Sequence, residues 1–170
     1  MKVKVDKKIQ YQELIEKENL TRRNWKIIVD DKNLTAANQL YDNLCKCSGR
    51  MGISVERPEI ERISARSAEG LINEMKNMKL NNELRIVVII LNRFSESHYK
   101  QIKYYLNTEV GTPSQVVKAE NLSKNLSYFT NVLCQMIVKM GGRLFKINFM
   151  DQLYERVNNK LIVILINSIN

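Results

Sequence analysis

The sequence predicts an α/β fold: a Rossmann-like open, mostly parallel sheet with helices on both faces. Short β-branched runs alternate with segments of helical spacing, which favours parallel strands joined by right-handed crossovers. Residues 84–91 (LRIVVIIL) are almost entirely apolar, as is typical of a central parallel strand covered on both faces. A length of 170 residues with 44% hydrophobic side chains fits one domain with a substantial core.

The first half of the chain predicts two strands and two helices. Residues 24–29 (NWKIIV) form a short β-branched run that ends at two aspartates, which indicates a buried strand and a turn. Residues 35–47 carry apolar side chains at helical spacing, and two glycines then end this helix. Residues 52–57 (GISVER) predict a second strand closed by a proline, and residues 67–78 predict a helix with Ser67 as its cap.

After the central strand, a polar loop leads into a predicted helix over residues 97–107. A turn at residues 111–113 (GTP) precedes a strand over 115–118. Residues 122–140 form the longest helical pattern, which Gly-Gly ends in a left-handed stop. Two further strands are expected at residues 144–149 and 161–167.

The charge of the chain predicts affinity for polyanions. Its 27 basic and 18 acidic residues give a net charge of +9. The segment 92–146 holds eight basic and three acidic residues, so more than half of this charge lies within a third of the chain. A merely soluble basic protein is the alternative that charge alone leaves open.

The cysteines and the apolar runs predict a reduced, intracellular protein, cytoplasmic or nuclear. Three cysteines, at positions 45, 47 and 134, are an odd number, and the basic N-terminus is followed by no apolar stretch typical of a secretory leader. The spacing of the first two lacks a second pair, which disfavours a zinc site. The longest apolar runs are six residues each and are too short to span a membrane.

Other catalytic classes find little support. His98 is the only histidine, and no cysteine or carboxylate has a visible reason to lie beside it, which disfavours a catalytic triad. No strand is followed by a glycine-rich phosphate loop of the dinucleotide or P-loop type. Asp30 and Asp31 follow the first strand but are better explained as a turn.

Four side chains in the basic segment are suited to bind one terminal phosphate: Tyr99, Lys103, Gln115 and Lys139. Tyr99 and Lys103 are four residues apart, so on a helix they lie on one face, about 5.4 Å along the axis. A phenol, two ammonium groups and an amide all donate hydrogen bonds to phosphate, and the tyrosine ring can stack on a base. If the fold brings them together, the chain binds a nucleic-acid end.

We expect this site at the carboxyl ends of the strands, where ligands bind in open parallel sheets. The loop 92–98 follows the central strand, and the first turn of the next helix offers N–H groups and a positive dipole end to an anion. The alternative is that Tyr99 and Lys103 are an exposed pair on an amphipathic helix, that Gln115 is a surface residue, and that the helix dipole alone favours Lys139.

The order of these residues resembles the MID domain of the Argonaute/Piwi family. The resemblance rests on Y-x-x-x-K at 99–103, P-S-Q at 113–115 and K-x-G-G at 139–142. The motifs P-S-Q-V-V and C-Q-M-x-x-K-M-G-G are more similar to the Piwi branch than to the Argonaute branch. Upstream, NWKIIVDDKN and MGISVERPEI are similar to the segment that leads into MID, so the resemblance covers about residues 20–167.

The resemblance implies that the chain binds the 5′-phosphorylated end and first nucleotide of a small guide RNA. Tyr99 would stack on the first base and touch the phosphate, and Lys103, Gln115 and Lys139 would bind the phosphate oxygens. Secondary contacts are expected from one residue of the long helix and from the loop that matches the base-reading segment: Gln135, Asn92, Arg93 and His98. The Piwi-type glutamine at 135 implies Mg²⁺ near Gln115.

The resemblance also implies a division into a connector (1–22), a MID-like domain (23–150) and the start of a truncated PIWI-like segment (151–170). Partners would be the PAZ and PIWI domains of a longer parent protein, with no membrane. Asn167 stands where the first catalytic aspartate of the nuclease domain is expected, so this chain alone should not cut RNA. Ile137 replaces an asparagine usual near the phosphate. Two alternatives stay open: a truncated piece of a guide-dependent RNase H-type ribonuclease, or a degenerate MID-like interaction module without ligand.

Overall fold

The computed structural model describes residues 16–65, 67–78, 80, 83–92 and 96–144. Four parallel strands form one sheet in the order β2 (Glu59–Ile63), β1 (Trp25–Asp30), β3 (Ile86–Leu91) and β4 (Ser114–Lys118). The nearly all-apolar run becomes β3, which lies between β1 and β4. The predicted α/β class with a parallel sheet is confirmed.

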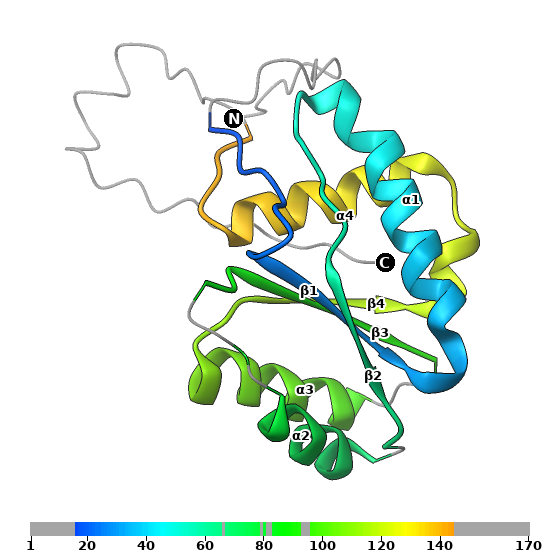
Figure 1. Ribbon diagram of the computed structural model, residues 1–170, viewed down its shortest axis with the longest axis vertical. Helices are drawn as coiled ribbons and strands as arrows, with labels where there is room; N and C mark the ends of the chain where they lie inside the picture. The colour runs from blue at the N-terminus through cyan, green and yellow to red at the C-terminus, as the bar shows by residue number, and fades with distance from the viewer. Residues whose placement is uncertain (1–15, 66, 79, 81–82, 93–95, 145–170) are drawn as a thin grey trace, which may run out of the picture.

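Helices cover both faces of this sheet (Figure 1). Helices α1 (Leu34–Met51) and α4 (Leu126–Lys139) pack on one face, and α2 (Ala68–Asn77) and α3 (Glu96–Tyr104) pack on the other. A π-helical turn, Tyr105–Val110, continues α3, and short 3₁₀ turns precede α1 and α4. Each crossover helix runs back against its strand, so its last turn returns to the amino ends of the strands.

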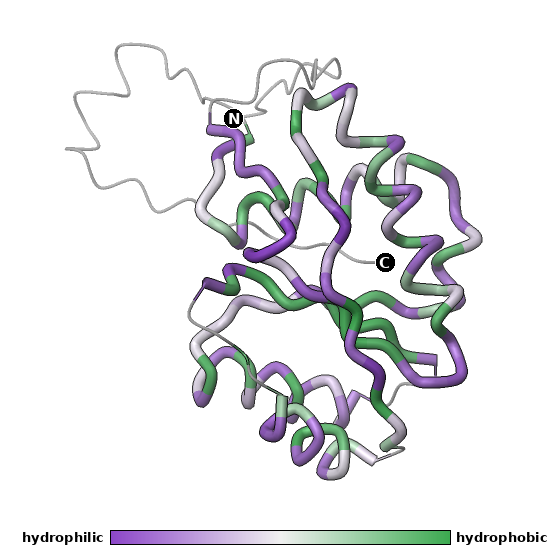
Figure 2. The backbone as a smooth tube through the Cα atoms, viewed as in Figure 1, coloured by the Kyte–Doolittle hydropathy of each residue, from purple (hydrophilic) through white to green (hydrophobic). Residues whose placement is uncertain are grey.

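The alternation of side chains along β1 and β3 separates two cores. Trp25, Ile27 and Val29 point toward α1 and α4, whereas Ile28 points toward α2 and α3 with Val87 of β3. All five are fully buried, and the tube in Figure 2 is green through the centre of the sheet. The two-sided burial explains why these strands are apolar without alternation.

The second strand was predicted in the wrong place. Residues 52–57 make a single parallel bridge, between Val55 and Leu20, and the strand that pairs with β1 is β2, which follows Pro58. Both segments have short β-branched patterns, so only the register against β1 decides which one enters the sheet. One contact that favours this register is the hydrogen bond from the Lys26 ammonium group of β1 to Glu61 of β2, at 3.0 Å.

Other boundaries also move. The α-helix predicted over 97–107 ends at Tyr104 and continues as the π-helical turn. The helix predicted over 122–140 begins at Leu126, because Asn125 caps it by accepting a hydrogen bond from the Tyr128 backbone N–H. The strands expected at 144–149 and 161–167 lie outside the described residues, except Leu144, which is in no strand. The cap at Ser67 is confirmed.

The Gly-Gly stop after α4 has a physical cause. Gly141 adopts φ of 98°, a backbone conformation that favours glycine. A Cβ atom at Gly142 would lie 2.4 Å from Ile137 Cγ2, so only glycine allows this close approach. The chain therefore turns sharply at the carboxyl end of α4.

We expect Trp25→Phe to lower the free energy of unfolding by about 1–3 kcal/mol. The indole Nε1–H of this buried residue donates to the Glu56 carbonyl oxygen at 3.0 Å, and phenylalanine leaves that oxygen without its donor. Urea unfolding followed by far-UV circular dichroism measures the change. Tyr104→Phe is the control, because Tyr104 is 66% exposed. Equal stability of Trp25→Phe and wild type would contradict this role of the indole.

Candidate functional site

Two lysine ammonium groups converge on the first residue of β4. Lys103 Nζ donates to Ser114 Oγ at 2.9 Å and also contacts the Ser114 carbonyl oxygen. Lys139 Nζ donates to the same carbonyl oxygen at 2.9 Å and to Gln115 Oε1 at 2.6 Å. Residues 103, 115 and 139, far apart in sequence, therefore form one cluster.

The crossover geometry explains this convergence. Lys103 lies in the last turn of α3 and Lys139 is the last residue of α4, while Ser114 begins β4. Because α3 and α4 run antiparallel to the strands on opposite faces, their carboxyl ends flank the amino end of this edge strand. Each helix therefore delivers one lysine, from its own side of the sheet.

The predicted location at the carboxyl ends of the strands is wrong for this cluster. Helix α3 begins near the carboxyl end of β3, but Lys103 lies almost at its other end, seven residues after Glu96. The expectation that the N–H groups of the first turn would hold the anion beside Lys103 fails for the same reason. The carboxyl ends of two helices instead favour the two cations themselves.

The two glutamines extend the cluster along α4. Gln115 is 7% exposed, and its Nε2 donates to Gln135 Oε1 at 3.1 Å and to the Val116 carbonyl oxygen at 3.4 Å. Its Oε1 accepts from Lys139, so the amide orientation is fixed from both sides. Gln115 is therefore a buried link between Lys139 and Gln135 rather than a surface residue.

Tyr99 lies at the margin of the cluster. Lys103 Nζ is 5.7 Å from the centroid of the Tyr99 ring, within cation–π range, as expected for residues one turn apart. Tyr99 is 39% exposed, so part of it is accessible to a ligand. The arrangement places an aromatic surface beside the ammonium pair.

The lysine pair is electrostatically unfavourable without an anion. Partial burial, and then the nearby Lys139 charge, lower the pKa of Lys103 from its ordinary 10.5 to about 8. Burial also lowers the pKa of Lys139. In the described part of the chain neither lysine forms an ion pair with a carboxylate. An anion placed between them would remove this repulsion.

A cavity of about 370 Å³ opens beside the two ammonium groups. The residues that link α3 to β4 complete its wall with the two lysines and Ser114: Asn107, Gly111, Thr112 and Pro113. Gly111 has φ of 73°, a conformation that suits glycine and turns the chain into β4. This volume is large enough for a phosphate group.

Asn92 and His98 do not join this cluster. They line a different cavity, of about 560 Å³, with Asp30 of β1 and Ile102 of α3, at the carboxyl ends of β1 and β3. Asn92 Oδ1 also accepts a hydrogen bond from Asn33. Arg93 lies outside the described residues.

Sequence reasoning missed Ser114, whose carbonyl oxygen both lysines share. The P-S-Q motif contains it, but nothing in the sequence alone shows that a backbone carbonyl is the meeting point. Ile137, at the position where the family has an asparagine, is fully buried among core residues and so makes no polar contact at the site.

The described residues contain neither a candidate metal cluster nor a helix suited to cross a membrane. Within residues 16–144, apart from the undescribed positions, no group of three or more His, Cys, Asp or Glu side chains could hold a metal ion. The three cysteines are free thiols. No helix in the described part of the chain combines the length and apolar character needed to cross a membrane.

Comparisons with known proteins agree on one family. A family model described as the Piwi domain matches residues 86–164. Piwi-like protein 1 of Gallus gallus is 35% identical over 127 residues, which are 73% of this chain. The chain spans only 14% of the length of that relative.

Solved structures show the same fold. The crystal structure of Drosophila Piwi matches 82% of this chain and 20% of its own, with a TM-score of 0.74 and 18% identity. The MID domain of Arabidopsis thaliana AGO5 matches 76% of this chain and 95% of its own, with a TM-score of 0.59 and 23% identity. Clostridium butyricum Argonaute bound to a guide DNA and a target DNA matches 79% of this chain and 22% of its own, with a TM-score of 0.60 and 13% identity. The chain therefore belongs to the Argonaute/Piwi family, and its described part has the α/β fold of the family's MID-domain structures.

Proposed function

We propose that this chain binds the 5′-phosphorylated end and first nucleotide of a small guide RNA, as the MID domain of a Piwi-type protein in RNA-mediated gene silencing. The observation that carries the proposal is the convergence of Lys103 and Lys139 on one carbonyl oxygen, without a carboxylate partner in the described residues. A terminal phosphate carries almost two negative charges near neutral pH, whereas an internal phosphodiester carries one. Two ammonium groups therefore favour an end over the middle of a strand.

The other residues of the cluster fit this ligand. Gln115 acts through Lys139, because its Nε2 already donates to Gln135 Oε1 and to the Val116 carbonyl oxygen. The accessible Tyr99 ring beside Lys103 offers a stacking surface of the kind that binds bases with about 1–3 kcal/mol each. The Clostridium butyricum relative is bound to a guide DNA, which supports a guide nucleic acid as the partner. Asn92 and His98 line the separate cavity at the carboxyl ends of β1 and β3, so the proposal does not count them among the contacts to the first base, and Arg93 lies outside the described residues.

The phosphate itself gives the test. We expect a 3′-labelled RNA oligomer with a 5′ phosphate to bind on the order of 10- to 100-fold more tightly than the same oligomer with a 5′ hydroxyl, from one or two charge-assisted hydrogen bonds. Fluorescence anisotropy at one fixed salt concentration measures both dissociation constants. A 5′-phosphorylated DNA oligomer in the same assay shows whether the sugar matters. Equal affinity for the two RNA ends rejects the proposal in favour of an interaction module without this ligand.

The residues near Gln115 do not make a magnesium site by themselves. Its Oε1 already accepts from Lys139, and Gln135 Oε1 accepts from Gln115. Mg²⁺ prefers carboxylate, phosphate and water oxygens, and two nearby ammonium groups oppose a second cation. The described residues thus give no basis for Mg²⁺ in binding, and the proposal assigns it no role.

We also propose that binding in this chain makes and breaks no bond. A guide-directed ribonuclease is the alternative for a longer parent, since the Piwi domain model matches through residue 164. We propose in addition that the PAZ and PIWI domains of such a parent protein are partners of this chain, and that the location is cytoplasmic or nuclear. Incubation of this chain with a guide and a labelled complementary RNA tests the proposal, because cleavage by the chain would contradict it.

A further inference from the structure

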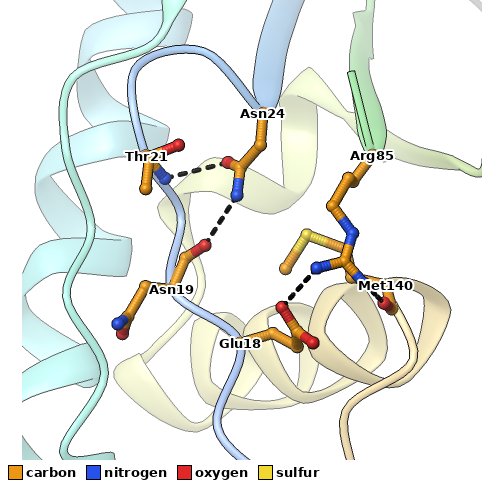
Figure 3. Close-up of polar contacts among 6 residues, drawn as sticks. All are labelled: Glu18, Asn19, Thr21, Asn24, Arg85 and Met140. Carbon is orange, nitrogen blue, oxygen red and sulfur yellow. Dashed lines mark hydrogen bonds and ion pairs between the residues drawn. The ribbon is translucent and has the colours of Figure 1, made fainter. Parts of the chain in front are cut away.

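The carboxyl end of α4 is fastened to two other segments of the chain through Arg85 (Figure 3). The guanidinium Nη1 donates to Glu18 Oε2 at 2.6 Å, and Nη2 donates to the Met140 carbonyl oxygen. The backbone N–H of Arg85 donates to the Asn24 carbonyl oxygen at 2.8 Å. Arg85 therefore connects the segment before β1, the start of β3 and the residue that follows Lys139.

The segment before β1 is itself ordered by hydrogen bonds. Asn24 Oδ1 accepts from the Thr21 backbone N–H at 2.8 Å, and Asn24 Nδ2 donates to the Asn19 carbonyl oxygen at 2.8 Å (Figure 3). Leu20, between them, is fully buried in the core. Glu18 is therefore a fixed anchor for the Arg85 guanidinium rather than a loose surface charge.

The end of α4 needs such an anchor. The last carbonyl groups of a helix lack intrahelical donors, and a guanidinium at this negative end of the dipole is favourable. Lys139 immediately precedes the Met140 carbonyl that Arg85 holds, and its two site contacts are 2.9 and 2.6 Å long. A displacement of about 1 Å would take both beyond ordinary hydrogen-bond distance.

We propose that Arg85 is a positioning residue for the phosphate site: it holds the carboxyl end of α4 where Lys139 reaches Ser114 and Gln115. Its own charge is paired with Glu18, so it acts through Lys139 rather than by touching the phosphate. The consequence for RNA binding rests on the proposed function, but the positioning can be measured without RNA.

Arg85→Met tests the proposal, with Arg143→Met as the matched control. Arg143 also pairs with a glutamate of the N-terminal segment, Glu16, but this ion pair does not include a carbonyl group of α4. We expect the preference for 5′-phosphorylated over 5′-hydroxyl RNA to fall about tenfold in Arg85→Met and to stay unchanged in Arg143→Met. Arg85→Lys, which can keep one of the two contacts, should fall between.

A titration separates positioning from general stability. If Lys139 moves away in Arg85→Met, Lys103 loses the neighbouring charge that, after burial, lowers its pKa, so this pKa should rise above about 8. Nuclear magnetic resonance of lysine labelled at Cε follows this pKa in the folded chain without RNA. If Arg85→Met does not fold, Glu18→Gln, which removes the carboxylate anchor, should change the same pKa in the same direction.

The outcomes are distinguishable. An unchanged Lys103 pKa in folded Arg85→Met, or in Glu18→Gln where Arg85→Met does not fold, overturns the positioning role, whatever the RNA binding shows. A raised Lys103 pKa in the variant supports the positioning role even if the wild type binds the two RNA ends equally. That second result would reject the proposed function alone.

Discussion

Lys103→Met and Lys139→Met are each expected to remove most of the preference for a 5′ phosphate, on the order of 10- to 100-fold in relative affinity. Each variant deletes one of the two ammonium groups that meet at Ser114 while keeping a side chain of similar length. The paired titrations with 5′-phosphorylated and 5′-hydroxyl RNA measure the loss directly. The affinity for 5′-hydroxyl RNA should change much less, because that RNA has no terminal phosphate and binds only through its other nucleotides.

Lys103→Met should not lose stability at pH 7 and should gain some. The folded state holds Lys103 partly buried beside Lys139, and this lowers its pKa. The charged form is therefore less favourable in the folded than in the unfolded chain, and methionine removes that penalty. Thermal unfolding by circular dichroism measures the change. Higher stability with lost binding is typical of a functional site rather than a structural ion pair.

Lys100→Met is the matched control on the same helix. Lys100 is 72% exposed at its side chain and pairs with Glu96 at 2.8 Å, four residues earlier. It carries the same charge as Lys103 but is not one of the residues that donate to Ser114 or Gln115, so its loss should weaken the binding of both RNA ends equally and slightly. If Lys100→Met and Lys103→Met reduced the phosphate preference equally, general attraction would explain binding, and the specific site would be rejected.

Much of the fold could be predicted because local signals and tertiary contacts agree. The apolar run that becomes β3 and the serine cap of α2 are determined by neighbouring residues, and both were predicted. The choice between residues 52–57 and 59–63 as the partner of β1 depends on the register across the sheet. No short sequence pattern contains that information.

The site shows the same division. The candidate residues came from the order of Tyr99, Lys103, Gln115 and Lys139 in the sequence. The structure links Lys103, Gln115 and Lys139 by hydrogen bonds, with Ser114 between the two lysines. Their location was predicted wrongly, at the carboxyl ends of the strands, although a crossover helix returns to the amino ends in its last turn. The shared carbonyl oxygen of Ser114 could not be predicted, since it depends on packing at both faces of an edge strand.

Binding of a 5′-phosphorylated RNA is expected to be strongest near pH 7 and to fall as the pH rises above about 8. The phosphate needs both ammonium groups, but the Lys103 pKa is about 8 in the free chain. Above that pH the site must take up a proton when it binds, so the logarithm of the binding constant should fall by up to about one per pH unit, until the raised pKa of the complex is reached. Below a pH of about 6 the phosphate loses one charge, and affinity falls again.

An all-adenine oligomer is suited to this measurement, because its bases do not ionise between pH 7 and about 9.5, and its 5′-hydroxyl form is the control. Only the phosphorylated form should show the alkaline decrease in affinity.

Without RNA, the deprotonation of Lys103 should raise the stability of the chain as the pH rises. Since its folded pKa lies below the unfolded value, the unfolded chain binds more protons between about pH 8 and 10.5, and Lys103 contributes a rise in stability across that range. Deprotonation of Lys103 is therefore expected to weaken RNA binding and to stabilise the fold over the same pH range. The remaining contacts of the fold must hold the charged lysine in place at lower pH. A flat pH profile for the phosphorylated RNA would show that the two ammonium groups do not act together on the ligand.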